Sequence, residues 1–93
     1  MEFCVYLILS QKLNKYRSYV GYTKNIRNRL YLHNNSKGAK FTKGRKWKII
    51  YLKKYKNKII AMKEKYKLKK NYKMRRELIL KYIKNENFNS FTL

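Results

Sequence analysis

The chain has 93 residues, which suits one domain with a single modest hydrophobic core. It carries 26 Lys and Arg residues against 4 Asp and Glu residues, a formal net charge of +22. Such a surplus predicts a polyanionic partner, and nucleic acid fits better than an anionic membrane because no segment has the apolar face of an interfacial helix. One cysteine and one histidine exclude an intrachain disulfide and a zinc cluster.

The sequence predicts an intracellular protein in a reducing compartment. No apolar stretch approaches the roughly 20 residues that a membrane span needs. The chain opens with Glu2 and has no basic start before its apolar run, so we expect no secretion signal. Cys4 lies in that apolar run and is expected to be a buried free thiol.

Two strands are predicted at the start of the chain. Residues 4–10 form a continuous apolar run of strand length, typical of a central strand. Polar residues 11–15, with Asn14 as turn former, separate it from residues 17–22, which are rich in aromatic and β-branched types. We therefore expect a hairpin in which Tyr6 and Tyr19 could pair across the sheet, and in which Gly21 marks a bulge or a close approach.

A helix is predicted next, with Thr23 or Asn25 as its cap. Ile26, Leu30 and His33 share one face, since they lie at i, i+4 and i+7. Arg29 lies beside that face, four residues before His33, so the two side chains are expected to point the same way.

Residues 34–46 are predicted to form a basic loop that follows a nucleic-acid backbone. Phe41 and Trp47 are available for stacking, although a place in the core is favoured for Trp47. The alternative is a flexible charged loop with Trp47 in the core. The basic residues of this loop are Lys37, Lys40, Lys43, Arg45 and Lys46.

The rest of the chain predicts a third strand over residues 47–52 and two helices capped by Asn57 and Asn71. Ala61, Lys65 and Leu68 share a stripe of the first, and Met74, Leu78 and Tyr82 share one of the second. The fold class is therefore α/β: a small sandwich with a three-stranded, mainly antiparallel sheet flanked by three helices. We expect one domain over residues 1–84 and a C-terminal tail over residues 85–93.

Two pairs of side chains are candidates for chemistry on a phosphate. Tyr6 and Tyr19 could orient water or act as bases, although their strand positions favour half-buried core aromatics. Arg29 could clamp a phosphate while His33 orients or protonates, and a solvated helix face explains that spacing equally well.

In order and spacing, these motifs resemble the GIY-YIG endonuclease superfamily, particularly its small single-domain branch. The resemblance covers nearly all of residues 4–80. The segments that carry it are 5–7, 19–21, Thr23 with 25–26, 29–30, 33–34, 38–40, 47–51, Ala61 and 66–69.

The resemblance implies a role for each matching residue. Tyr6 and Tyr19 would line the site and act on the attacking water or the scissile phosphate. Arg29 would steady the phosphate and His33 would assist. Gly21 is the glycine of the second motif, and Tyr22 would place its backbone near the site.

The chain departs from the family at the metal ligand. The family holds one divalent ion, Mg²⁺ or Mn²⁺, with a glutamate that lies four residues after a small residue and just before an aromatic. That position is Lys65, between Ala61 and Tyr66. An ammonium cannot bind a cation, and the neighbouring Glu64 is a poor substitute because one residue turns a helix by about 100°. Lys65 would keep a positive charge beside the phosphate without a Lewis acid.

We therefore expect a DNA-binding endonuclease domain whose hydrolysis of phosphodiesters is impaired as written, with no cofactor if no ion binds. Branched, nicked or single-stranded DNA are candidate substrates, as in repair or recombination, and RNA stays open. The chain would act as a monomer or a homodimer. The first alternative is a non-catalytic nucleic-acid-binding module with the same fold. The second is a basic structural protein, such as a ribosome-associated one, with coincidental motifs.

Overall fold

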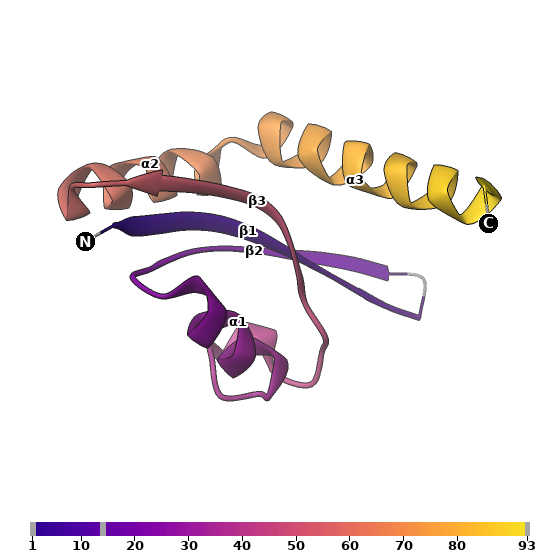
Figure 1. Cartoon of the computed structure of the whole chain (residues 1–93), viewed down its shortest axis with the longest axis horizontal. Coiled ribbons are helices and arrows are strands. Elements are labelled where there is room, and N and C mark those ends of the chain that lie inside the picture. Colours follow the sequence, from indigo (N-terminus) through magenta and orange to yellow (C-terminus); the bar gives the residue numbers. More distant parts are fainter. Residues whose placement is uncertain (1, 14, 93) are drawn as a thin grey trace.

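The centre of the fold is a three-stranded antiparallel sheet with strand order β2-β1-β3 (Figure 1). The computed structural model describes residues 2–13 and 15–92, with side chains described as far as residue 86. The strands are β1 (Phe3–Lys12), β2 (Lys15–Thr23) and β3 (Lys48–Tyr55). The apolar run of residues 4–10 is the buried part of the central strand, as the sequence predicts.

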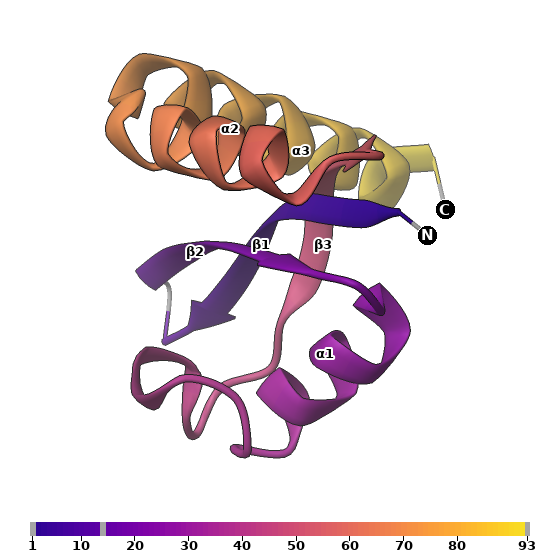
Figure 2. The same ribbon diagram turned by 90° about the vertical axis from the view of Figure 1, so that its left-hand side faces the viewer.

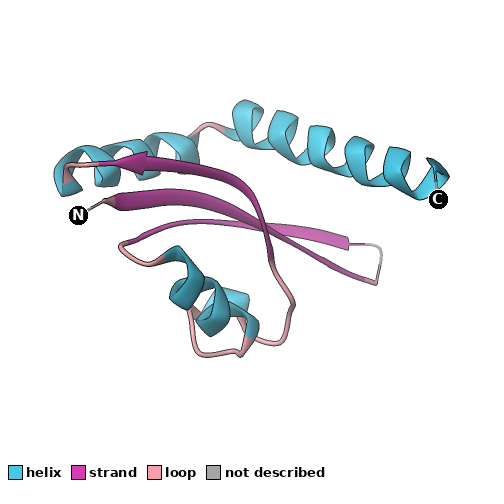
Figure 3. Cartoon of the chain, in the orientation of Figure 1, coloured by secondary structure: helices cyan, strands magenta, loops and turns pink. Residues whose placement is uncertain are grey.

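Three α-helices and one short 3-10 helix complete the fold (Figure 3). They are α1 (Ile26–Asn34), η1 (Lys40–Thr42), α2 (Lys58–Lys70) and α3 (Tyr72–Thr92). An asparagine side chain accepts a backbone N–H in the first turn of each α-helix, and the three are Asn25, Asn57 and Asn71. The predicted fold class and caps are confirmed.

The helices lie on both sides of the sheet (Figure 2). α1 and the loop that follows it cover one face, and α2 and α3 cover the other. Because successive side chains of a strand point to opposite faces, β1 supplies Val5 and Leu7 to the α2–α3 side and Tyr6 and Ile8 to the α1 side. One strand thus anchors two separate hydrophobic clusters.

The two clusters contain most residues of the predicted helical stripes, but neither Lys65 nor Tyr82. On the α2–α3 side, Ala61 and Leu68 are buried, and Met74 and Leu78 pack against them. On the α1 side, Trp47 is buried against Tyr6 and Ile8, which confirms its predicted place in the core. Cys4 is a buried free thiol.

The expected pairing of Tyr6 with Tyr19 is wrong. In the hairpin Tyr6 lies opposite Gly21, and Tyr19 lies opposite Ile8. The turn sets this register, since Lys12 pairs with Lys15 and Leu13 takes a positive φ of 53°. Tyr6 and Tyr19 are therefore diagonal neighbours on the same face.

The C-terminal part differs from the sequence expectation at the level of the backbone. α3 continues to Thr92, whereas a tail was expected over residues 85–93; the side chains of residues 87–93 lie outside what the structure describes. No helix within the described residues is both long and apolar enough to cross a membrane.

Candidate functional site

A buried hydrogen bond joins the first motif tyrosine to the single histidine. The hydroxyl of Tyr6 lies 2.8 Å from His33 Nε2. Their ring centroids are 5.9 Å apart in an edge-on arrangement. Tyr6 is 1% exposed and His33 is fully buried. Residues of β1 and α1, 27 positions apart, thus form one polar pair inside the α1 side of the core.

Thr42 fixes the direction of the hydrogen bonds in this pair. Its hydroxyl donates to the Ala39 carbonyl at 2.8 Å and lies 2.9 Å from His33 Nδ1. A hydroxyl has one proton to donate, so His33 Nδ1 must be the N–H that donates to Thr42. Nε2 of the neutral ring is then the acceptor, and Tyr6 donates to it. The neutral imidazole thus accepts a hydrogen bond from the phenol and donates one to Thr42.

Two glycines make room for this pair. A Cβ on Gly21 would clash with the Tyr6 hydroxyl, and a Cβ on Gly38 would clash with His33 Nδ1. Gly21 therefore marks a close approach, one of the two options expected from the sequence. Gly38 plays the same part in the loop after α1, so both rings are held between strand and loop backbone.

Arg29 lies close enough to change the titration of both groups. Burial raises the pKa of the Tyr6 hydroxyl above its ordinary value, and hydrogen bonding and charge from Arg29 oppose that rise. Burial lowers the pKa of His33, and the positive charge of Arg29 lowers it further. The guanidinium would therefore stabilise a phenolate at Tyr6 and keep His33 neutral.

An aromatic row continues from the pair to the surface. The Tyr19 ring lies 5.2 Å from the His33 ring and stacks on Phe41 with a centroid distance of 6.2 Å. Phe41 is 48% exposed, and the Arg17 guanidinium lies 5.2 Å from its centroid. Tyr19 and Arg29 are half-buried, so they form the solvent-facing side of the cluster while Tyr6 and His33 are sealed.

Two cations of the basic loop hydrogen-bond to other parts of the chain. Arg45 donates from Nε to the Ser10 hydroxyl at 3.0 Å and from Nη2 to the Lys15 carbonyl at 3.3 Å, which ties the loop to the hairpin. Lys46 Nζ donates to the Asn34 carbonyl at 3.1 Å. Four of the five predicted phosphate contacts are exposed: Lys37, Lys40, Lys43 and Lys46.

Lys65 lies over two other tyrosine rings. Its ammonium lies 5.7 Å from the Tyr22 ring centroid and 5.4 Å from that of Tyr66. Tyr22 itself packs on the α2–α3 side of the sheet. Among the described side chains, Lys65 makes no hydrogen bond or ring contact with Tyr6 or His33. The structure thus brings together Tyr6, Tyr19, Arg29 and His33, whereas the ring contacts of Lys65 are with Tyr22 and Tyr66.

The donor set does not fit a divalent cation. The Lys65 ammonium has no lone pair to offer a metal. The Glu64 carboxylate accepts from Lys67 Nζ at 3.3 Å and borders a pocket with Val5 and Tyr51, on the face away from Tyr6. Within the part of the chain that the structure describes, no three His, Cys, Asp or Glu residues gather.

Sequence reasoning missed Thr42 and the part played by Gly38. Thr42 lies in a segment that reads as a polar loop, and its short 3-10 helix leaves no periodic signal. The one sequence signal for the role of Gly38 is that it follows His33 closely in the chain. Thr42 nevertheless sets the tautomer of the histidine, because it occupies Nδ1.

Known proteins resemble this chain over most of its length. The family model described as "GIY-YIG catalytic domain" matches residues 2–87. A UPF0213 protein of Oceanobacillus iheyensis is 48% identical over 52 residues, 55% of this chain and 60% of that protein. A UPF0213 protein of Clostridium perfringens is 37% identical over 75% of this chain and 78% of that protein. The UPF0213 protein YazA of Bacillus subtilis is 35% identical over 72% of this chain and 69% of its own length. No solved structure matches the chain significantly.

Proposed function

Because the chain belongs to the GIY-YIG catalytic domain family, a family of nucleases, we propose that it binds DNA through α1 and the loop that follows it and hydrolyses phosphodiesters poorly. The proposal rests on one observation: a lysine stands where the family resemblance places the metal-holding glutamate, and the adjacent Glu64 is paired with Lys67 on the other face. Phosphate binding survives such a change, because the positive charge is kept, whereas metal-assisted hydrolysis does not.

The proposed phosphate contacts are the solvent-facing members of the cluster. Arg29 offers a planar fork of donors that suits phosphate oxygens, and the Tyr19 hydroxyl and the exposed lysines of the loop add further contacts. Tyr6 and His33 act behind them. Tyr6 donates a hydrogen bond to His33 Nε2, and Arg29 opposes the rise that burial imposes on the pKa of the Tyr6 hydroxyl.

Restoring the carboxylate tests the proposal. Lys65→Glu should gain nicking activity with Mg²⁺ or Mn²⁺ on branched, nicked or single-stranded DNA, whereas the unchanged chain shows little. The matched control is Lys63→Glu, which makes the same charge change at an exposed position of the same helix and should stay inactive. Adding Arg29→Ala to Lys65→Glu should abolish the gain.

A Lys65→Glu protein that folds, binds DNA and yet stays inert with both metals on all three substrates would overturn the idea that Lys65 is the cause. Circular dichroism and binding measured on the same preparation separate that outcome from misfolding. An inert but folded protein would favour the second candidate function, a module that only binds nucleic acid. The burial of Tyr6 and His33 away from solvent supports that function. Steep salt dependence is expected in both cases.

A further inference from the structure

A groove of about 480 Å³ lies between α3 and the strands, and Trp47 of the cluster on the α1 side also borders it. Leu9, of the same strand face as Val5 and Leu7, contributes to it from β1, and Tyr82 and Ile83 contribute from α3. In Figure 1 the second half of α3 runs above the hairpin end of β1 and β2. The volume falls within the roughly 300–1,000 Å³ that is usual for small-ligand sites.

Two tyrosines line this groove from opposite elements. Tyr16 comes from β2 and is 45% exposed, and Tyr82 comes from α3 and is half-buried. Aromatic rings that border a groove are the usual surface on which an unpaired nucleobase stacks, because every base has a π-face. Because Tyr16 is partly exposed, its ring remains accessible to a base that enters the groove.

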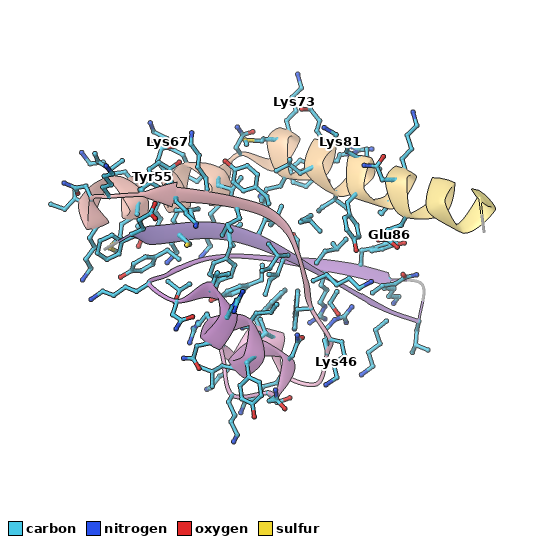
Figure 4. The ribbon with its side chains drawn as sticks, in the orientation of Figure 1. Lys46, Tyr55, Lys67, Lys73, Lys81 and Glu86 are labelled. Carbon is cyan, nitrogen blue, oxygen red and sulfur yellow. The ribbon has the colours of Figure 1, made fainter. Side chains whose placement is uncertain are left out.

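The charges of the groove favour a phosphate at one end. Lys46 and Lys48 line it beside the tyrosines. Glu86 is the carboxylate of the lining, and Figure 4 shows it beneath α3, on the side of the strands. Burial and a hydrogen bond with Glu86 raise the pKa of the Tyr82 hydroxyl, while Lys48 opposes that rise. The hydroxyl therefore stays protonated and bonded to Glu86, which leaves the ring as the surface offered to a base.

We propose that this groove is a second nucleic-acid site, which takes a nucleobase against Tyr16 and Tyr82 and the attached phosphate on Lys46 and Lys48. Charge decides the occupant. A second copy of the chain would bring another +22 and be repelled, whereas a nucleic-acid strand is complementary. The inference rests on the nucleic-acid binding of the proposed function but not on hydrolysis.

Matched substitutions test the site. The probe is a fluorescein-labelled single strand of roughly 15 nucleotides, at the long end of the site sizes of small strand-binding domains, followed by anisotropy. Tyr16→Ala should weaken binding by about 5- to 100-fold, the usual range for losing one stacked base, and Tyr16→Phe should restore it. Tyr72→Ala, an exposed tyrosine of the same helix layer outside the groove, should bind as the unchanged chain does.

The lysines have their own control. Lys48→Ala should weaken binding and lower the salt slope by about one. Lys73→Ala removes the same charge from α3, but its side chain points away from the sheet (Figure 4), so binding should change less than twofold. The Tyr16→Ala effect should persist in an Arg29→Ala background, because Arg29 does not line the groove.

Three results would overturn the inference. Equal affinity of Tyr16→Ala, Lys48→Ala and their controls would remove the second site while leaving the proposed function intact. Absence of any binding by the unchanged chain would end both. Binding of polyglutamate with the affinity of the oligonucleotide and the same loss in Tyr16→Ala would make the groove a site for acidic peptides instead.

Discussion

Gly21 and Gly38 each occupy a position where the backbone lies too close to a buried ring for a side chain to fit. Each would direct a Cβ into a buried ring atom of the Tyr6–His33 pair, and buried rings have little room to move. We expect Gly21→Ala and Gly38→Ala each to cost about 1–3 kcal/mol of unfolding free energy, the usual cost of overpacking. Urea denaturation measures the loss.

The third glycine is the control for that prediction. Gly44 has a φ of 74° and open space around its Cβ direction, and asparagine is the residue that best tolerates such a backbone. Gly44→Asn should therefore change the unfolding free energy much less than the two alanine variants. An equal loss in all three would show that the close approach to Tyr6 and His33 is not the cause.

His33 should make the protein sensitive to acid. Its pKa is lowered in the folded state by burial and by Arg29, so below about pH 6.5, the ordinary histidine value, the unfolded chain binds a proton that the folded chain does not. Stability should then be unaffected by this group above that pH and fall as the pH drops through the window below it.

Thermal unfolding between neutral and mildly acidic pH checks the sign. His33→Asn should have a lower melting temperature at neutral pH, and its melting temperature should fall less as the pH drops below neutral. If the variant loses as much melting temperature on acidification as the unchanged protein does, His33 is not the cause of the acid sensitivity.

At the scale of single elements, the asparagine caps account for where the helices begin. Asn57 accepts from the backbone N–H groups of Ile59 and Ile60 at 2.8 and 3.2 Å. Asn57→Ala should cost about 1 kcal/mol. Asn57→Asp should keep the cap and add a favourable charge to a first turn that has no acidic residue, so its melting temperature should equal or exceed that of the unchanged chain.

The elements were predictable because each has a local signal. β1 has an apolar run, α2 and α3 have apolar stripes at helical spacing, and an asparagine precedes each helix. The hairpin register was not predicted, although a turn centred on residues 13 and 14 would have placed Tyr6 opposite Gly21. Register depends on one turn position, and a shift of one residue changes every partner.

The site was predictable only where its residues lie on regular elements. Arg29 and His33 share a helix face, so spacing alone places them together. Thr42 and Arg45 lie in a loop without periodicity, and their hydrogen bonds to His33 and Ser10 depend on how the loop folds back. The family resemblance supplied Lys65, which no local pattern marks as special.

At the scale of the whole molecule, charge opposes folding. A net charge of +22 on 93 residues repels itself, and salt screens exposed charges over about 10 Å at 0.1 M. The melting temperature should therefore rise as sodium chloride increases from low to moderate concentration. Replacing the exposed Lys56, Lys58 and Lys63 by Gln should raise the melting temperature at low salt and weaken its salt response; an unchanged response would show that repulsion is not limiting.

The chain has one tryptophan, and its indole Nε1 donates to the Thr42 carbonyl at 2.9 Å. Emission excited at wavelengths that spare the tyrosines therefore comes from a single place beside the short helix η1. Any event that loosens this helix would expose the indole to water and move its emission to the red, while releasing the Thr42 hydroxyl from the imidazole. The protein thus contains its own label-free optical reporter of the state of its histidine.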